Sequence, residues 1–373
     1  MPLIAIAANS VWNVVNFRSG LIRALQDRGL DVAVVAPSGP RMEDLKALGA
    51  SFHEVAIDPR GLSPLADLKV MRAFARHFRA LRPAAMLGFT AKPNIWGSFA
   101  AHELGIPVIN NISGLGTAFI KGGLLERLVT VLYTRALRRS ATVFFQNPDD
   151  RDLFVGRRIV RGEQAVLIPG SGIDLEHFAP VRRRKDDGPF TFLLPARMIW
   201  DKGVREYVEA ARTLQSKGRR ARFQILGPLD PPGGQSVPEA EVGGWVETGA
   251  IDYLGAADDV RPAFAGADCI VLPSYREGTP RALLEAGAMA IPTVTTDVPG
   301  CREVVEDGVT GLWCDARSAA ALAGAMERML ALDPERRAAM GVAARRRMEQ
   351  RFDQSIVHRA YIEALQKLGI LKA

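Results

Sequence analysis

The chain has 373 residues, of which 48% are hydrophobic and 24% charged, and its mean hydropathy is +0.04. This composition is typical of soluble globular proteins and excludes disordered, collagen-like and polytopic membrane classes. The length is too great for one ordinary α/β core and suits two domains of about 150–200 residues each. No apolar run approaches about 18 residues, so we expect no membrane-spanning helix. The opening MPLIAIAANS indicates a first strand instead of a signal peptide.

The net charge of +7 lies almost entirely in the first half of the chain. Residues 1–180 hold 21 basic and 15 acidic side chains, whereas residues 181–373 hold 27 and 26. Such asymmetry indicates an anionic partner for the first half, either a membrane surface or a nucleic acid.

Three cysteines, Cys269, Cys301 and Cys314, are too few for a disulfide framework and lack the spacing of a metal site. We expect them to be core thiols of a cytoplasmic protein. The sequence shows no other cluster of metal ligands, and we predict neither a metal nor a cofactor.

Short apolar runs alternate with helical patterns through the first half of the chain. The predicted strands cover 3–8, 31–36, 85–89, 107–110, 142–146 and 165–168, and helices are expected over 19–28, 41–48, 67–82 and 124–139. This alternation predicts βαβ units and a parallel sheet. We therefore predict an N-terminal Rossmann-like domain over residues 1–178.

A second series follows the charged, proline-containing segment PVRRRKDDGP, which indicates a linker over 179–189. Strands are predicted over 190–195, 222–226, 251–254, 268–272 and 293–295, and helices over 204–217, 260–266, 279–287 and 316–332. The α/β class with two doubly wound domains is therefore expected, the second covering 190–352. Two further helical patterns end the chain, and the segment 353–373 either packs back on the first domain or makes an oligomer contact.

The stretch LPSYREGTPRALLE follows a predicted buried strand and carries Glu277 and Glu285. Ligands of open α/β sheets bind at the carboxyl ends of strands, so a site is expected here. The two carboxylates can accept hydroxyls of a sugar and of a ribose, and the amides of Gly278 and Thr279 can bind a phosphate or sugar oxygen. In the alternative, Glu277 caps a helix and Glu285 pairs with Arg281.

A second strand end, PARMIWDKG, places Arg197 and Lys202 on either side of a short loop. Two cations in this position can neutralise a diphosphate, the arginine by bidentate contact and the lysine as a point charge. The alternative is a pair of solvated charges.

In order along the chain, these motifs resemble the retaining GT-B glycosyltransferases of family 4. The resemblance is carried by IPGSGIDLEHFAP, ARMIWDKG, ILG, YLG, ADCIVLPSYREGTPRALLEAGAMAIPTVTTDVPG and GVTGLW. The segments KPNIWGSFAAHELGIPVINNISGLGTAF and EGTPRALLEAGA are similar to those of bacterial enzymes that extend undecaprenyl-diphosphate-linked glycans in N-glycan, capsule or O-antigen assembly. The resemblance implies two tandem Rossmann-like domains facing a central cleft.

The resemblance also implies roles for individual residues. Glu277 would contact the transferred sugar, Glu285 would hold the ribose, and Arg197 and Lys202 would stabilise the leaving diphosphate. The donor-side residues expected are Gly278, Thr279, Pro280, Glu285, Leu254 of the YLG motif, and Asn16. Many members carry a glycine pair in the first loop, whereas residues 9–20 of this chain have Asn16 and Arg18 there.

The acceptor site is expected in the first domain, on residues that follow predicted strands. These residues are Thr90, Lys92, Asn94, Asn111, Ser113 and Gly114, within a second loop that extends from 111 to 117. Lys92 is a candidate contact for an acceptor diphosphate, and the alternative is a solvated lysine. Many members have a histidine in the second loop, where this chain has Asn111 and Ser113, so we do not expect a catalytic histidine there. The resemblance implies a front-face route in which the leaving phosphate assists acceptor deprotonation.

Two predicted helices of the first domain carry clustered cations beside apolar residues. They hold Arg72, Arg76 and Arg79 in one case and Arg135, Arg138 and Arg139 in the other. A basic amphipathic helix can lie on an anionic bilayer surface, so these residues are predicted membrane contacts. The alternative is an apolar face packed on the sheet with solvated cations.

The reaction implied is transfer of a hexose or N-acetylhexosamine from a UDP-sugar to a polyprenyl-diphosphate-linked saccharide, with retention and without a metal. The expected location is the inner face of the cell membrane, as a peripheral protein. A sugar-nucleotide epimerase or hydrolase of the same fold remains an alternative. A basic nucleic-acid-binding protein is disfavoured, because RNP-like and zinc-knuckle patterns are missing from the sequence.

Overall fold

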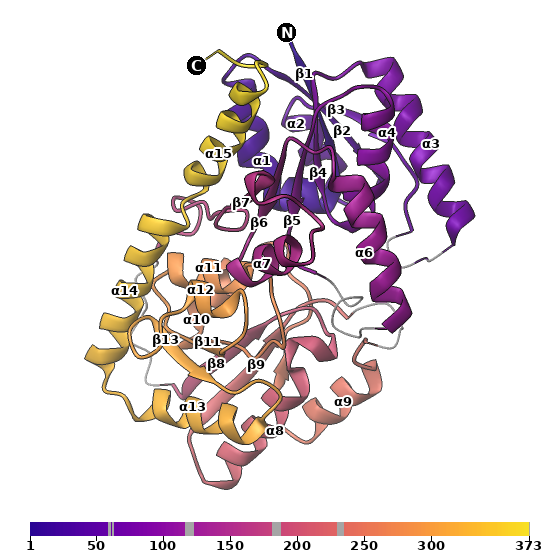
Figure 1. Cartoon of the computed structure of the whole chain (residues 1–373). Helices are drawn as coiled ribbons and strands as arrows, with labels where there is room; N and C mark the ends of the chain where they lie inside the picture. The colour runs from indigo at the N-terminus through magenta and orange to yellow at the C-terminus, as the bar shows by residue number, and fades with distance from the viewer. Residues whose placement is uncertain (59–60, 62, 116–122, 181–187, 230–234, 373) are drawn as a thin grey trace. The chain divides into compact units, whose positions relative to one another are not determined.

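The computed structural model describes residues 1–58, 61, 63–115, 123–180, 188–229 and 235–372. The chain divides into two compact units (Figure 1). The N-terminal unit is Met1–Ser171 with Gln354–Ala373, and the C-terminal unit is Gly172–Asp353. The division thus lies at Ser171 and Gly172, whereas the sequence led us to expect the first domain to extend to residue 178. Residues 181–187 of the predicted linker lie outside the described residues.

Within its described residues, the N-terminal unit has a seven-stranded parallel sheet of order β3-β2-β1-β4-β5-β6-β7. The strands are β1 (Leu3–Ala7), β2 (Asp31–Ala36), β3 (Ser51–Glu54), β4 (Ala85–Phe89), β5 (Val108–Ile112), β6 (Thr142–Phe145) and β7 (Ala165–Leu167). The helices are α1 (Val11–Gln26), α2 (Met42–Ala47), α3 (Pro64–Leu81), η1 (Pro93–Gly97), α4 (Ser98–Glu103), α6 (Gly123–Leu137), α7 (Pro148–Gly156), η2 (Gly162–Gln164) and α15 (Gln354–Lys367). The strand order reverses between β1 and β4.

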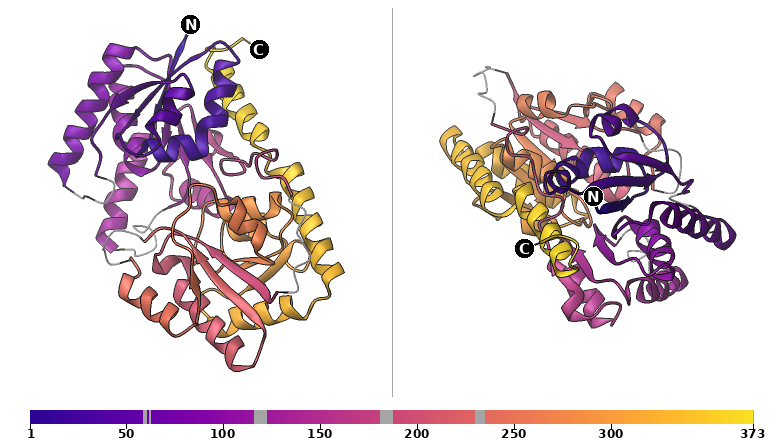
Figure 2. Two further views of the ribbon diagram at one scale, coloured as in Figure 1. Left: turned by 180° about the vertical axis from the view of Figure 1, so that it is seen from behind. Right: turned by 90° about the horizontal axis from the view of Figure 1, so that it is seen from above.

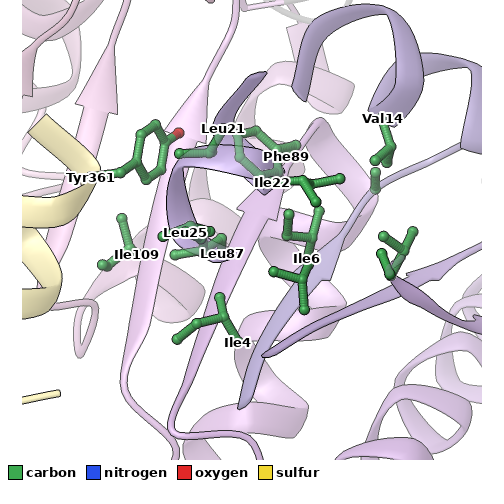
Figure 3. Close-up of a cluster of buried hydrophobic side chains, with 14 of the residues drawn as sticks. Ile4, Ile6, Val14, Leu21, Ile22, Leu25, Leu87, Phe89, Ile109 and Tyr361 are labelled. Atoms are coloured by element: carbon green, nitrogen blue, oxygen red, sulfur yellow. The ribbon is translucent and has the colours of Figure 1, made fainter. Parts of the chain in front are cut away.

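Helix α1 begins eight residues earlier than the sequence pattern indicated, so most of the predicted loop over residues 9–20 is helical. Ser10 caps the helix, because its side chain accepts a hydrogen bond from the backbone N–H of Asn13. The apolar face then starts at Val11 and Val14, which are buried. Figure 3 shows α1 packing its apolar side chains against those of β1 and β4.

The described residues of the C-terminal unit form a six-stranded parallel sheet of order β10-β9-β8-β11-β12-β13. Its strands are β8 (Phe190–Pro195), β9 (Ala221–Leu226), β10 (Asp252–Tyr253), β11 (Cys269–Leu272), β12 (Thr293–Thr296) and β13 (Gly311–Cys314). Its helices are η3 (Trp200–Lys202), α8 (Val204–Ser216), α9 (Glu239–Glu247), α10 (Arg261–Gly266), α11 (Arg281–Ala288), α12 (Cys301–Val304), α13 (Ala319–Ala331) and α14 (Pro334–Arg351). Here the strand order reverses between β8 and β11.

The last two helices belong to different units. Helix α14 packs on α11 in the C-terminal unit, whereas α15 packs beside α1 in the N-terminal unit (Figure 2). Val357, Tyr361 and Leu365 of α15 are buried in the same apolar cluster as β1 and α1. The predicted α/β class, with two doubly wound domains in tandem, is confirmed.

Candidate active site

The candidate donor site lies where the strand order of the C-terminal unit reverses, which is where doubly wound sheets bind their ligands. The loop after β8 ends in η3 and carries Lys202, and the loop after β11 carries Ser274 and Glu277. Gly203 brings the two loops into contact. It adopts φ +71°, and a Cβ atom there would lie 2.1 Å from the carbonyl oxygen of Pro273. Only glycine permits that approach.

The Glu277 carboxylate is held by two donors on one oxygen. Lys202 Nζ and Ser274 Oγ both donate to Oε1, the latter at 2.7 Å, and the carboxylate and lysine side chains are only 12% and 22% exposed. The main chain of this loop is held as well, because Thr296 Oγ1 donates to the Ser274 carbonyl at 2.5 Å. Sequence reasoning missed Ser274, although its position three residues before Glu277 was visible in PSYREG. Glu277 is thus a fixed carboxylate beside a cation.

Glu285 lies one turn into α11 and is paired with Arg281, whose Nε is 3.0 Å from Oε1. Burial raises the pKa of Glu285, and the charge of Arg281 opposes that rise. The Glu285–Arg281 pair, which the sequence offered as an alternative to ribose binding, is therefore formed. The other half of that alternative is not formed, because the N-cap position of α11 is Pro280 and Glu277 does not cap the helix. The helix begins at Arg281, two residues later than predicted.

The remaining donor-side residues are less closely grouped. Gly278 and Pro280 are buried and Thr279 is half-buried, all in the loop before α11. Arg197 is exposed two residues beyond β8, and Leu254, just after β10, is 42% exposed.

Asn16, the last of the predicted donor-side residues, lies in the N-terminal unit. It is on α1, where its Nδ2 donates to the carbonyl of Trp12 and its Oδ1 accepts from Arg41. The structure therefore places this residue on a helix and not in a loop.

The acceptor-side candidates follow β4 and β5 of the N-terminal unit. Thr90 has φ +68°, which is unusual for a β-branched residue and is typical of functional sites, as is the π-helical turn η1 that follows. Lys92 is not a solvated lysine, because its Nζ is 2.5 Å from Asp67 Oδ1 of α3 and both side chains are 15% exposed. The lysine charge is thus held at the start of η1.

Asn94 and Asn111 are buried at 1% exposure each. Asn94 Nδ2 donates to the Asn111 carbonyl at 2.8 Å, and Asn94 Oδ1 accepts from Asn110 at 2.9 Å. These amides hold the ends of β4 and β5 in place. Ser113 is exposed, whereas Gly114 is half-buried and adopts φ +138°. Gly116 and Thr117, at the end of that loop, lie outside the described residues.

The six arginines predicted as membrane contacts are all exposed. Arg72, Arg76 and Arg79 lie on α3, whose opposite face buries Phe74 and Phe78. Arg135 lies on α6, with Arg138 and Arg139 just beyond it, and Leu128 and Val131 of that helix are 57% and 46% exposed. Among the described residues, no helix combines the length and apolarity needed to cross a bilayer.

Comparison with known proteins identifies the family. Residues 15–170 match the glycosyl transferase 4-like domain, and residues 189–332 match the glycosyl transferases group 1. The chain belongs to the family 4 glycosyltransferases. Its relatives include N,N'-diacetylbacillosaminyl-diphospho-undecaprenol alpha-1,3-N-acetylgalactosaminyltransferase of Campylobacter jejuni, 27% identical over 94% of this chain and 95% of that protein. The capsular polysaccharide biosynthesis glycosyltransferase CapM of Staphylococcus aureus is 23% identical over 91% and 90%.

Solved structures of other proteins have the same fold. Sucrose-phosphate synthase of Thermosynechococcus elongatus superposes with a TM-score of 0.80 at 18% identity, covering 99% of both chains. HepE of Anabaena, solved with UDP and glucose, gives a TM-score of 0.79 at 17% identity over 97% of this chain and 99% of that one. The predicted GT-B fold is thereby confirmed.

Proposed function

We propose that the chain transfers a hexose or N-acetylhexosamine from a UDP-sugar to a polyprenyl-diphosphate-linked saccharide, with retention of anomeric configuration. The observation that carries the proposal is the fixed Glu277 carboxylate, with Lys202 and Ser274 on one oxygen, at the strand-order reversal of the C-terminal unit. The Campylobacter relative, whose name gives a diphospho-undecaprenol-linked sugar as acceptor, supports the same acceptor class because the similarity spans both chains.

On the donor side, the Glu277 carboxylate accepts hydrogen bonds from hydroxyls of the transferred sugar, and the Glu285 carboxylate accepts them from the ribose hydroxyls. Lys202 and Arg197 neutralise the diphosphate as the glycosidic bond breaks, together with the amides before α11. In this proposal charge stabilisation comes from side chains and amides in fixed positions, so the reaction requires no metal. The leaving phosphate takes the proton of the attacking acceptor hydroxyl on the same face of the sugar, which gives retention.

On the acceptor side, the proposal places the diphosphate near Lys92 and Thr90 and the saccharide near Ser113 and Gly114. Asn94 and Asn111 hold the two loops in position, because both amides are buried and hydrogen-bonded. The exposed arginines of α3 and α6 hold the N-terminal unit against an anionic membrane at the inner face of the cell membrane, where a polyprenyl-linked acceptor is available.

The test is sugar transfer by the purified protein, with a panel of labelled UDP-sugars and an undecaprenyl-diphosphate-linked saccharide as acceptor. We expect one donor to give a longer lipid-linked glycan, with UDP released only when the acceptor is present. Glu277→Ala should nearly abolish transfer, and Glu247→Ala, which alters an exposed glutamate of α9, should not. UDP release without acceptor would indicate a hydrolase, and full turnover by Glu277→Ala would contradict the proposed site.

A further inference from the structure

Tyr361 is a C-terminal residue that reaches the strand ends of the N-terminal unit. Its ring comes from α15, is 1% exposed, and packs 4.7 Å from Phe144 and 5.9 Å from Phe89, between centroids. Figure 3 shows the ring pointing from α15 towards Phe89 and Leu21. Packing alone would be served equally by phenylalanine, so the buried hydroxyl needs another explanation.

The hydroxyl accepts a hydrogen bond from Asn111 Nδ2 at 2.9 Å, across 250 positions of sequence. Asn111 Oδ1 accepts from Gln146 Nε2 at 3.1 Å, so both polar atoms of the amide are held. Burial raises the pKa of Tyr361 to about 12, although the nearby positive charge of Arg18 opposes the rise. The hydroxyl is therefore neutral at physiological pH and acts through this hydrogen bond.

The hydrogen bonds continue from Asn111 to the loop after β4. The Asn111 carbonyl accepts from Asn94 Nδ2, and the backbone N–H of Asn94 donates to the Thr90 carbonyl at 3.0 Å. One connected set of bonds thus links Tyr361 to Thr90 at the positive φ angle, to the π-helical turn, and to the start of the loop that holds Ser113. Networks of this kind fix a geometry more strongly than separate bonds do.

We propose that Tyr361 is a positioning residue of the acceptor site, which makes the C-terminal helix α15 part of the active site. Through its hydrogen bond to Asn111, and from there to Asn94, its hydroxyl fixes the conformation of the two loops after β4 and β5. This inference rests on the proposed function for the identity of the ligand, and it adds a role for a residue that touches neither substrate.

The test is Tyr361→Phe in the full chain, which keeps the ring and removes the hydroxyl. We expect the acceptor KM to rise about fivefold to tenfold while the donor KM is unchanged, the size expected for one lost buried hydrogen bond. Tyr207→Phe is the matched control, because that buried tyrosine donates to the carbonyls of Phe192 and Gln224 in the C-terminal unit. The control should leave the acceptor KM unchanged.

A second measurement needs no substrate. Hydrogen exchange of peptides covering residues 88–98 and 108–115 should be faster in Tyr361→Phe than in the wild-type protein, and unchanged in Tyr207→Phe. Unchanged exchange in both peptides, or an unchanged acceptor KM in an active Tyr361→Phe protein, would overturn the inference. A wild-type protein that transfers no sugar to any lipid-linked acceptor would instead contradict the proposed function.

Discussion

Lys202 and Glu277 form an ion pair that joins the loops after β8 and β11, at the strand-order reversal of the C-terminal unit. Ser274, which is buried in the loop after β11, donates to the same carboxylate oxygen. The orientation of the carboxylate therefore depends on a hydroxyl that we expect to touch no substrate. Such residues hold a reactive group close to its productive geometry.

Ser274→Ala tests this dependence. We expect kcat/KM to fall about tenfold, because one hydrogen bond to a charged group is lost from the carboxylate that contacts the sugar. Affinity for UDP, which lacks the sugar, should stay unchanged, whereas affinity for the UDP-sugar should fall. Calorimetric titration with both ligands measures the difference. Ser216→Ala, at the exposed end of α8, is the control, and equal losses for UDP and UDP-sugar would argue against the assigned role.

Gly203 is expected to be irreplaceable, because it sets the approach of the two loops. In Gly203→Ala the new Cβ meets the Pro273 carbonyl oxygen, so we expect a loss of at least about 2 kcal/mol in the free energy of unfolding, together with loss of activity. Gly218→Ala separates the backbone strain from the steric clash, since Gly218 has φ +70° with open space around it. This variant should lose only about 1 kcal/mol, the cost of the left-handed conformation alone. Denaturant unfolding compares the variants, and equal losses would show that the close approach is unimportant.

The fold was largely predictable from the sequence, because buried parallel strands give continuous apolar runs. The distinctive motif around Glu277 also located the loop after β11, where the candidate donor residues lie. The start of α1 could not be predicted, because Asn13 and Asn16 interrupt the apolar pattern of the first turns of the helix that Ser10 caps. The partners of Lys92 and Asn111 were also beyond sequence reasoning. Asp67 and Tyr361 come from distant segments, and only the packing of α3 and α15 on the N-terminal unit brings them near.

The affinity for UDP should depend on pH through Glu285. Only the ionised carboxylate accepts both ribose hydroxyls, so we expect affinity to fall as the pH drops through the raised pKa of Glu285. Arg281→Gln removes the cation that holds this pKa down. The pKa then rises further, and the loss of affinity moves to higher pH.

Titrations of both proteins between about pH 5 and 8 measure the shift, and comparison at equal pH cancels the titration of the UDP phosphate itself. Arg219→Gln, which breaks an exposed pair with Glu327, is the control and should leave the pH dependence unchanged. A shift to lower pH in Arg281→Gln would refute the role given to Glu285.

Membrane binding should depend on the exposed arginines of α3. Each cation near an anionic bilayer contributes about 1 kcal/mol, so replacing Arg72, Arg76 and Arg79 together by glutamine should weaken vesicle binding about a hundredfold at low salt. Sedimentation with vesicles containing phosphatidylglycerol measures this loss. The matched control replaces Arg212, Arg219 and Arg220, which are also exposed but lie in the C-terminal unit. Because both variants change the net charge by the same amount, a difference between them reports where the cations lie. Equal losses would show that the binding reflects overall charge and would contradict a membrane-facing surface on α3.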